Sequence, residues 1–101
     1  MTKYTITKSD DSYKIEVKGH SGYSDYGSDI VCASISTAVC LTANTIDKLG
    51  LSCNIVNNIH KEALYIIETD MKSEIVNKVM DSLVDYLDTI SLQYPKYIKK
   101  S

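Results

Sequence analysis

The sequence predicts an α+β domain with the order ββαββα, in which an antiparallel sheet carries two helices on one face. Residues 2–18 alternate apolar and polar side chains, which is the period of a strand. Two later stretches, after Ile30 and after Asp70, repeat apolar residues at helical spacing. Each amphipathic helix needs an apolar surface to cover, and one sheet face serves both. The 101 residues, 44% of them hydrophobic, suffice for a single domain, 1–101.

The first two strands are predicted from strict alternation. Tyr4 and Ile6 alternate with polar residues, and residues 9–12 (Ser-Asp-Asp-Ser) form a polar turn. The second run repeats the pattern with Tyr13, Ile15 and Val17. The short connection predicts a hairpin with one buried face.

The first helix is predicted from Ile30 to Leu49, about 30 Å long. Asp29 precedes it where an N-cap residue belongs, and Gly50 follows it as a typical C-terminal stop. Its expected buried stripe consists of Val31, Ile35, Ala38, Val39, Thr42, Ile46 and Leu49.

The second half repeats the two strands and the helix. Residues 51–60 and 62–68 contain the β-branched and aromatic residues typical of strands. A second helix is predicted over residues 70–92, before Pro95, and the tail 96–101 is expected to be partly ordered at most. The helix's apolar stripe comprises Val76, Val79, Met80, Leu83, Leu87 and Ile90.

Composition excludes several partners and cofactors. The 11 basic residues are all lysines, the net charge is −2, and no basic stripe appears, so no direct nucleic-acid partner is expected. No apolar run approaches the length of a membrane span and residues 1–5 lack a signal sequence, so we expect a cytoplasmic protein with no membrane partner. The odd number of cysteines, three, indicates free thiols.

Residues 19–29 break both periodic patterns. Three of the four glycines fall here (Gly19, Gly22 and Gly27), together with three serines. This composition predicts a loop that adopts unusual dihedral angles and can move.

Cys32 is the candidate nucleophile. With Asp29 as N-cap, Cys32 occupies the third helical position, near unpaired N–H groups and the positive end of the helix dipole. Both favour a thiolate and predict a lowered pKa, which the carboxylate of Asp29 opposes by repulsion. The alternative is that Cys32 is a small buried apolar residue.

His20 is the candidate cation that would offset the charge of Asp29 and pair, as an imidazolium, with the Cys32 thiolate. It lies at the exit of the second predicted strand, and residues 21–28 can span about 27 Å, so the loop can bring His20 to the start of the helix. A cysteine and a histidine within hydrogen-bond reach form an activated nucleophile, and helix-start N–H groups can hold an oxyanion. The alternative is a histidine merely tolerated at a strand end.

The remaining reactive residues have more ordinary interpretations. Cys40 and Cys53 are expected to be structural and His60 to lie at the surface. The spacing of cysteines and histidines matches no zinc motif and the glycines match no phosphate-binding loop, so no metal or cofactor is expected. Tyr23 and Tyr26 suit gripping a peptide, or one of them anchors the loop. Ser36, one turn past Cys32, lines the same pocket or is a plain helix serine.

The loop and helix start carry a resemblance to a known family. It lies in Gly19-His20-Ser21-Gly22-Tyr23 and in Tyr26-Gly27-Ser28-Asp29-Ile30-Val31-Cys32-Ala33. These segments resemble the ribosomal-processing cysteine protease family, Prp, whose length and element order the whole chain also matches. Ser21 and Ser34 stand where alanine is common, a departure that we expect to leave the chemistry intact.

The resemblance implies a function. Family members are endopeptidases that use a Cys–His dyad to remove a short N-terminal extension from large-subunit ribosomal protein twenty-seven, cutting after paired aromatic residues. The dyad carries over to His20 and Cys32, and the predicted substrate-binding residues are Gly19, Tyr26, Asp29 and Ser36. The substrate would be a ribosomal protein precursor, and the resemblance implies a homodimer.

Two other classes of function remain open. The first is a non-catalytic ribosome-assembly module that only grips a peptide. The second is a redox sensor that joins Cys32 to Cys40, but eight residues along a helix separate their Cα atoms by about 12 Å, too far for a disulfide.

Overall fold

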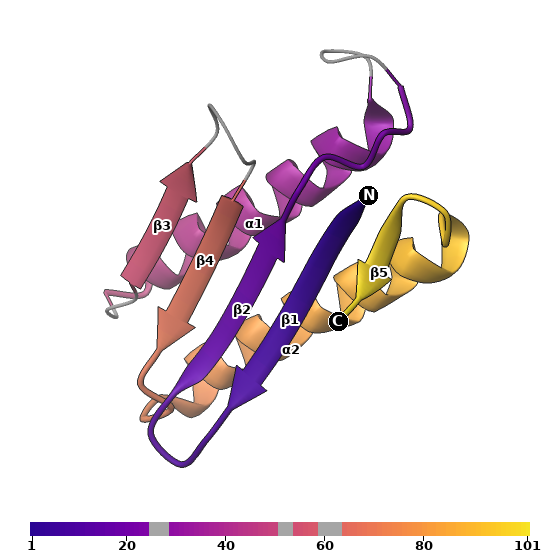
Figure 1. The fold of residues 1–101 in the computed structure, drawn as a ribbon. Helices are drawn as coiled ribbons and strands as arrows, with labels where there is room; N and C mark the ends of the chain where they lie inside the picture. Colours follow the sequence, from indigo (N-terminus) through magenta and orange to yellow (C-terminus); the bar gives the residue numbers. More distant parts are fainter. Residues whose placement is uncertain (25–28, 51–53, 59–63) are drawn as a thin grey trace.

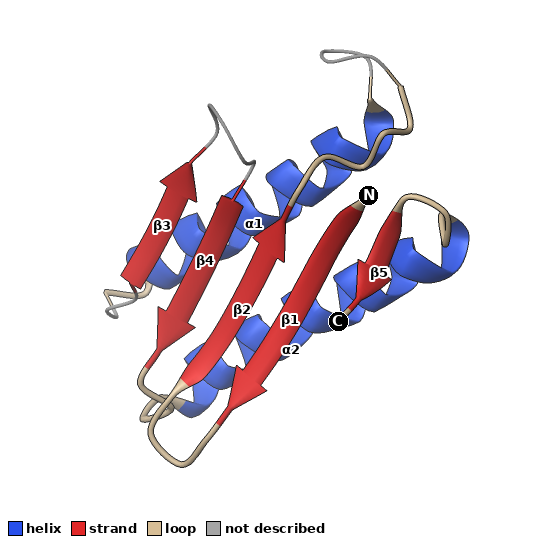
Figure 2. Ribbon diagram, viewed as in Figure 1, coloured by secondary structure: helices blue, strands red, loops and turns tan. Residues whose placement is uncertain are grey.

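The structure is a computed structural model, and it describes residues 1–24, 29–50, 54–58 (backbone only) and 64–101. The chain forms a sheet with both helices on one face (Figures 1 and 2). This confirms the predicted α+β class and the order ββαββα, to which the C-terminus adds a short strand. The elements are β1 (Thr2–Lys8), β2 (Tyr13–Lys18), α1 (Ile30–Lys48), β3 (Asn54–Asn58), β4 (Leu64–Thr69), α2 (Glu74–Gln93) and β5 (Ile98–Lys100).

The sheet has the strand order β3-β4-β2-β1-β5. Strands β1 to β4 pair in antiparallel fashion, with Ile15 opposite Ile6 on one side and Ile67 on the other. Strand β5 runs parallel to β1, so the sheet is mixed. The expectation of a partly ordered tail was wrong, because Ile98 is 1% exposed and pairs with Thr2 at the otherwise open edge of β1.

The core lies between the sheet and the helices. Alternate strand residues face it, as the period of two predicted, and α2 contributes fully buried side chains such as Met80 and Leu87. Two tyrosines extend across this layer to carboxylates of α2: Tyr4 Oη donates to Asp88 at 2.6 Å and Tyr13 Oη to Asp81 at 2.6 Å. These bonds attach α2 to β1 and β2.

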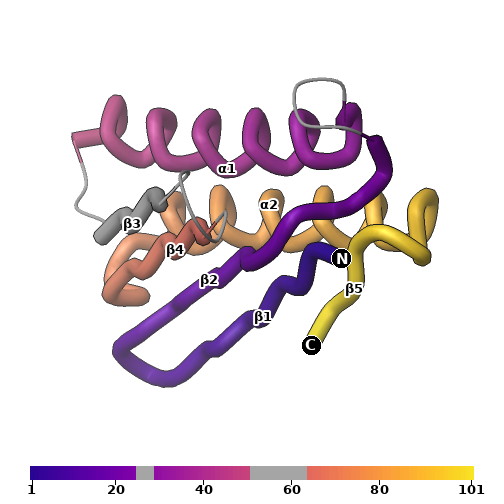
Figure 3. Tube along the Cα trace, turned by 45° about the horizontal axis from the view of Figure 1, so that its top comes forward, coloured from indigo at the N-terminus to yellow at the C-terminus, as the bar shows by residue number. Residues whose placement is uncertain are grey.

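Helix α1 begins at Ile30, as predicted, and it lies beside α2 (Figure 3). Leu49 does not join the buried stripe, since it caps the helix and is 44% exposed. By length and composition alone α1 could cross a membrane, which the sequence prediction overlooked. In this fold its residues Val31, Ile35, Val39 and Ile46 are buried in the domain core.

Helix α2 begins at Glu74, four residues later than predicted. Ser73 caps it by accepting a hydrogen bond from Val76 N at 3.2 Å. Asp70, the predicted start, instead closes a turn by accepting a hydrogen bond from Lys72 N at 3.0 Å. Met71, between these two residues, has φ +66°, and this left-handed conformation keeps Asp70 outside the helix.

Candidate active site

The segment that carries His20 leaves β2 at a constrained glycine. Gly19 has φ +95°, and a Cβ atom at this position would lie 2.8 Å from the carbonyl oxygen of Met1. Thr2 Oγ1 donates a hydrogen bond to the Gly19 carbonyl at 3.2 Å. The beginning of β1 therefore fixes the point from which His20 projects, and only glycine fits there without strain.

Asp29 joins the loop to the start of α1. Its Oδ1 accepts a hydrogen bond from Cys32 N at 2.9 Å, which is the predicted N-cap contact. Its Oδ2 accepts from the hydroxyl of Ser21, from Tyr23 N at 3.1 Å and from Ser24 N at 3.4 Å. One carboxylate thus holds both the first turn of the helix and the beginning of the loop.

The electrostatics of Asp29 and Cys32 differ from the sequence prediction. Burial tends to raise the pKa of Asp29, but hydrogen bonds from Ser21, Cys32, Ser24 and Tyr23 outweigh it and lower the pKa. Burial raises the pKa of the Cys32 thiol, and the charge of Asp29 raises it further. A backbone hydrogen bond from Ser21 opposes this rise without reversing it. The predicted lowering of the thiol pKa was wrong, because the helix dipole was weighed without the cost of burial.

The predicted dyad residues share one hollow. His20, Cys32, Asp29 and Ser36 line a cavity of about 450 Å³, together with Gly22, Ser24 and Ala33. Cys32 is half-buried and His20 is exposed. Among the described residues no hydrogen bond joins the imidazole to the thiol. The fold has brought the two groups to the same site, at the same end of the sheet, without pairing them.

Ser36 has a buried partner that the sequence did not reveal. Its Oγ lies 2.8 Å from the hydroxyl of Tyr65, which comes from β4 and is 8% exposed. This contact ties the wall of the cavity to the sheet. Tyr65 and Ser36 are 29 positions apart, so no local pattern could have paired them.

The other predicted site residues fall in different places. Gly19 lies one residue before the cavity wall and acts through its backbone. Tyr26, Cys53 and His60 lie outside the described residues. Cys40 is an exposed free thiol two turns farther along α1.

Two contacts around the site were not anticipated. Ser21, where alanine is common in the family, is 2% exposed and its hydroxyl donates to Asp29. Thr2 is equally buried and holds Gly19. Strand alternation through Tyr4 could have indicated the inward orientation of Thr2, but nothing in the sequence indicated the contact of Ser21. Tyr23 packs on the C-terminal aromatic residues, which agrees with the predicted alternative that one of the two loop tyrosines anchors the loop.

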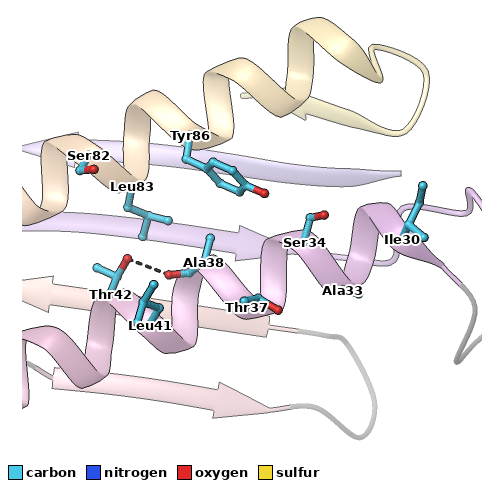
Figure 4. Close-up of a pocket in the computed structure, with 10 residues that line it drawn as sticks. All are labelled: Ile30, Ala33, Ser34, Thr37, Ala38, Leu41, Thr42, Ser82, Leu83 and Tyr86. Atoms are coloured by element: carbon cyan, nitrogen blue, oxygen red, sulfur yellow. Dashed lines mark hydrogen bonds between the residues drawn. The ribbon is translucent and has the colours of Figure 1, made fainter.

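A second, larger hollow of about 630 Å³ lies between the two helices (Figure 4). Its described lining is mostly small and apolar, and no cysteine, histidine or carboxylate stands among these described residues. In the part of the chain that the structure describes, no three His, Cys, Asp or Glu side chains converge to hold a metal ion. The smaller hollow therefore carries the groups for chemistry. The larger one is lined by Ile30, Ala33, Ser34, Thr37, Ala38, Leu41, Thr42, Ser82, Leu83 and Tyr86.

The cavity contains a thiol in the first turn of a helix, an imidazole, and N–H groups at the helix start. Hydrolases with a cysteine nucleophile use these groups. The comparison with known families agrees with this class. The chain belongs to the cysteine protease Prp family, whose model matches residues 1–99.

Solved structures support the fold assignment. An essential ribosomal processing protease Prp from Staphylococcus aureus, in complex with a covalently linked product peptide, is 24% identical with a TM-score of 0.89. The match covers 100% of this chain and 98% of that one. The same protease in complex with a substrate peptide gives 23% identity and a TM-score of 0.81, with the same coverage. A Streptococcus mutans protein is 20% identical with a TM-score of 0.81, and the match covers 100% of this chain and 92% of that one. No curated protein matches by sequence.

Proposed function

We propose that this protein is a cytoplasmic endopeptidase that removes the N-terminal extension of large-subunit ribosomal protein twenty-seven during ribosome maturation, with Cys32 and His20 as a catalytic dyad. The observation that carries the proposal is that these two side chains line one cavity at the start of α1. Membership of the cysteine protease Prp family supports it. So does the fold shared with a ribosomal processing protease that has been seen with substrate and product peptides.

The raised pKa of Cys32 determines the first chemical step. Burial, first, and the charge of Asp29 raise the pKa of the Cys32 thiol and so favour the thiol over the thiolate in the substrate-free protein. His20 must therefore accept the Sγ proton as the sulfur attacks the scissile carbonyl carbon. A carbon–sulfur bond forms, and the carbonyl electron pair moves to the oxygen. A preformed thiolate–imidazolium pair is not required.

The start of α1 supplies donors for the resulting oxyanion. Asp29 already occupies the N–H groups of Cys32, through Oδ1, and of Ala33, through its carbonyl oxygen. The N–H groups of Ile30 and Val31, at the helix start, have no hydrogen-bond acceptor among the residues that the structure describes. Collapse of the intermediate breaks the carbon–nitrogen bond, and His20 returns its proton to the leaving amine. Water, deprotonated by His20, then hydrolyses the thioester and restores the Cys32 thiol.

Substrate binding is assigned to Gly19, Tyr26, Asp29 and Ser36. Asp29 and Ser36 line the cavity beside Cys32, where they can face a bound peptide. The proposal for Gly19 depends on its backbone at the exit of β2. Tyr26 is proposed from the family resemblance alone.

We also propose that the protein is a homodimer. Ile30 is 53% exposed, Leu41 63% and Tyr86 39%, and all three line the hollow between α1 and α2 (Figure 4). The apolar character of α1 thus exceeds what its core-facing residues require. Burial of this surface against a second copy would remove it from water. Sedimentation equilibrium of the wild type and of Leu41→Lys tests this: a dimer that dissociates in the variant supports the proposal, and a monomeric wild type contradicts it.

One observation favours the non-catalytic alternative. The Cys32 pKa is raised, and no hydrogen bond links the thiol to His20 among the described residues. A module that only grips the peptide extension needs neither an acidic thiol nor a base. It predicts stoichiometric binding of the peptide without turnover.

The deciding experiment incubates the precursor with wild-type protein, Cys32→Ser and His20→Ala. Cleavage by the wild type alone, with all three proteins still binding the peptide, supports the dyad. Cleavage that survives in Cys32→Ser removes the assigned nucleophile. Binding without cleavage by the wild type supports the assembly module. Cys40→Ser is the matched control, since this exposed thiol on the same helix lies outside the cavity that holds His20 and Cys32 and should be dispensable.

A further inference from the structure

We infer that the C-terminal segment, residues 94–98, is a positioning element of the active site. It holds the His20 segment, residues 19–23, at both of its ends. The inference rests on the proposed function, because it assigns Tyr23, Tyr94, Tyr97 and Thr2 to the placement of the proposed base. None of these side chains is among the lining of the catalytic cavity.

The far end of the segment, after His20, is held by aromatic contacts. The ring of Tyr23 meets the ring of Tyr94 with a centroid separation of 5.6 Å and an interplanar angle of 80°. It meets Tyr97 at 5.1 Å and 84°. Both geometries are edge-to-face, and such pairs contribute beyond the area they bury. Tyr23 remains 40% exposed, and these are the two ring contacts that it makes among the described residues.

The near end of the segment, before His20, is held through the backbone of the same C-terminal residues. The carbonyl oxygen of Tyr97 accepts a hydrogen bond from Thr2 N at 2.9 Å. Thr2 in turn donates through Oγ1 to the carbonyl of Gly19 at 3.2 Å. A chain of two hydrogen bonds therefore connects Tyr97 to the residue directly before His20. Figure 3 shows the N-terminus lying between the segment that leaves β2 and the turn that leads to β5.

The position of His20 depends on these two attachments because its own side chain makes none. The imidazole is exposed, and it forms no hydrogen bond with any described residue. The placement of the ring is thus set by the backbone between Gly19 and Tyr23. A displacement of about 1 Å in a catalytic group costs up to about 100-fold in rate, so anchoring at this level matters for turnover.

Asp29 does not make these attachments redundant. Its carboxylate holds the N–H of Tyr23 and the hydroxyl of Ser21 from the helix side. The C-terminal segment holds the Tyr23 ring from the side of the sheet's edge strand. The two supports approach the loop from different elements, so each restrains the loop in a direction that the other does not.

The test compares Tyr23→Ala, Tyr23→Phe and Leu92→Ala in precursor cleavage. Loss of the Tyr23 ring should lower kcat by about 10- to 100-fold with little change in KM, and should shift the limb of the pH–rate profile that belongs to His20. Tyr23→Phe keeps the ring and should restore both. Leu92 is 83% exposed near the end of α2, so its truncation is a matched control that should change neither.

A second readout does not depend on cleavage. The 15N signals of the His20 imidazole should change position and sharpen in Tyr23→Ala, as the ring gains freedom, and should match the wild type in Tyr23→Phe. Tyr23→Leu, which keeps apolar bulk over Tyr94 and Tyr97, replaces Tyr23→Ala if thermal unfolding shows that the alanine variant does not fold. Unchanged kcat and unchanged His20 signals overturn the inference, and so does a rise in KM alone, which would make Tyr23 a substrate contact. Cleavage that persists in Cys32→Ser instead overturns the dyad and leaves the imidazole measurement decisive for positioning.

Discussion

In two regions of this protein a carboxylate raises the pKa of a neighbouring titratable group: at the contact between α2 and the sheet, and at the start of α1. Asp81 on α2 accepts a hydrogen bond from Tyr13, and Asp29 caps α1 beside Cys32. In both regions burial is the first cause of a raised pKa in the neighbouring acid, and the carboxylate adds to it. A raised pKa favours the protonated form in both regions. It stabilises the fold at Tyr13, whereas at Cys32 it disfavours the thiolate.

The difference lies in whether the neighbouring acid must ever lose its proton. Tyr13 serves the fold only in its protonated form, as the donor that attaches α2 to the sheet. In the proposed mechanism Cys32 must lose its proton to attack a peptide bond, and Asp29 opposes that loss. The same carboxylate also holds the helix start and the loop through hydrogen bonds from Cys32 N, the Ser21 hydroxyl and Tyr23 N. The predictions below test this division, beginning with the largest expected effect.

Gly19→Ala should damage the active-site region most. The new Cβ would lie 2.8 Å from Met1 O at a φ of +95°, so β1 or the His20 segment must move. We expect a loss of about 2 kcal/mol in the free energy of unfolding and at least about a tenfold loss in cleavage rate. Gly50→Ala is the control, since its φ is +71° with no heavy atom within 4 Å, so it carries only the backbone strain. Equal cleavage by both variants would contradict the role of Gly19 in placing His20.

Asp29→Asn should keep the N-cap of α1 and remove the negative charge beside Cys32. Asparagine caps helices about as well as aspartate and can still accept from Cys32 N through its carbonyl oxygen, but it carries no charge and its amide nitrogen cannot accept the hydrogen bonds from Ser21 and Tyr23. The alkylation midpoint of Cys32 should therefore move to lower pH. Site-resolved mass spectrometry of alkylation against pH measures this, with Cys40 as the internal reference. A midpoint that stays in place would show that Asp29 does not restrain the thiol.

Tyr13→Phe should weaken the fold and leave the thiol unaffected. The variant loses the 2.6 Å hydrogen bond to Asp81, whose side chain is 52% exposed and regains water. We expect the free energy of unfolding to fall by about 1 kcal/mol in urea titrations. The alkylation profile of Cys32 should match that of the wild type. A shifted profile would mean that the two regions are coupled through the sheet.

The two regions should also lose stability at opposite extremes of pH. Asp29 has a pKa below its ordinary 3.8, so its contribution is present above that value and disappears as the pH falls through the folded-state pKa. Tyr4 and Tyr13 have pKa values above 10.0, so their contribution is present below 10.0 and disappears as the pH rises through the folded-state values. Urea unfolding across this range should show Asp29→Asn differing less from the wild type in acid, and Tyr13→Phe differing less in alkali. If Asp29→Asn instead converged with the wild type in alkali, or Tyr13→Phe in acid, the contrast drawn between the two regions would be wrong.

The sequence predicted those parts of the protein that depend on local pattern. The alternation through Tyr4 and Tyr13 predicted the hairpin, and the position of Asp29 before an apolar helix predicted both the N-cap and the helical place of Cys32. The grouping of His20 and Cys32 around one cavity also followed from a loop whose two ends meet at the same end of the sheet. Residue type and spacing suffice to predict such features, because they depend on interactions between residues that are close in the sequence.

Only the tertiary structure decided how the site is held and how its thiol titrates. The partners of Gly19, Ser36 and Tyr23 come from β1, β4 and the C-terminus, and no spacing in the sequence indicates them. The sign of the Cys32 pKa shift depends on how much water packing removes, which a helix position alone does not give. Local order follows from adjacent residues, whereas burial and long-range contacts exist only once distant segments meet.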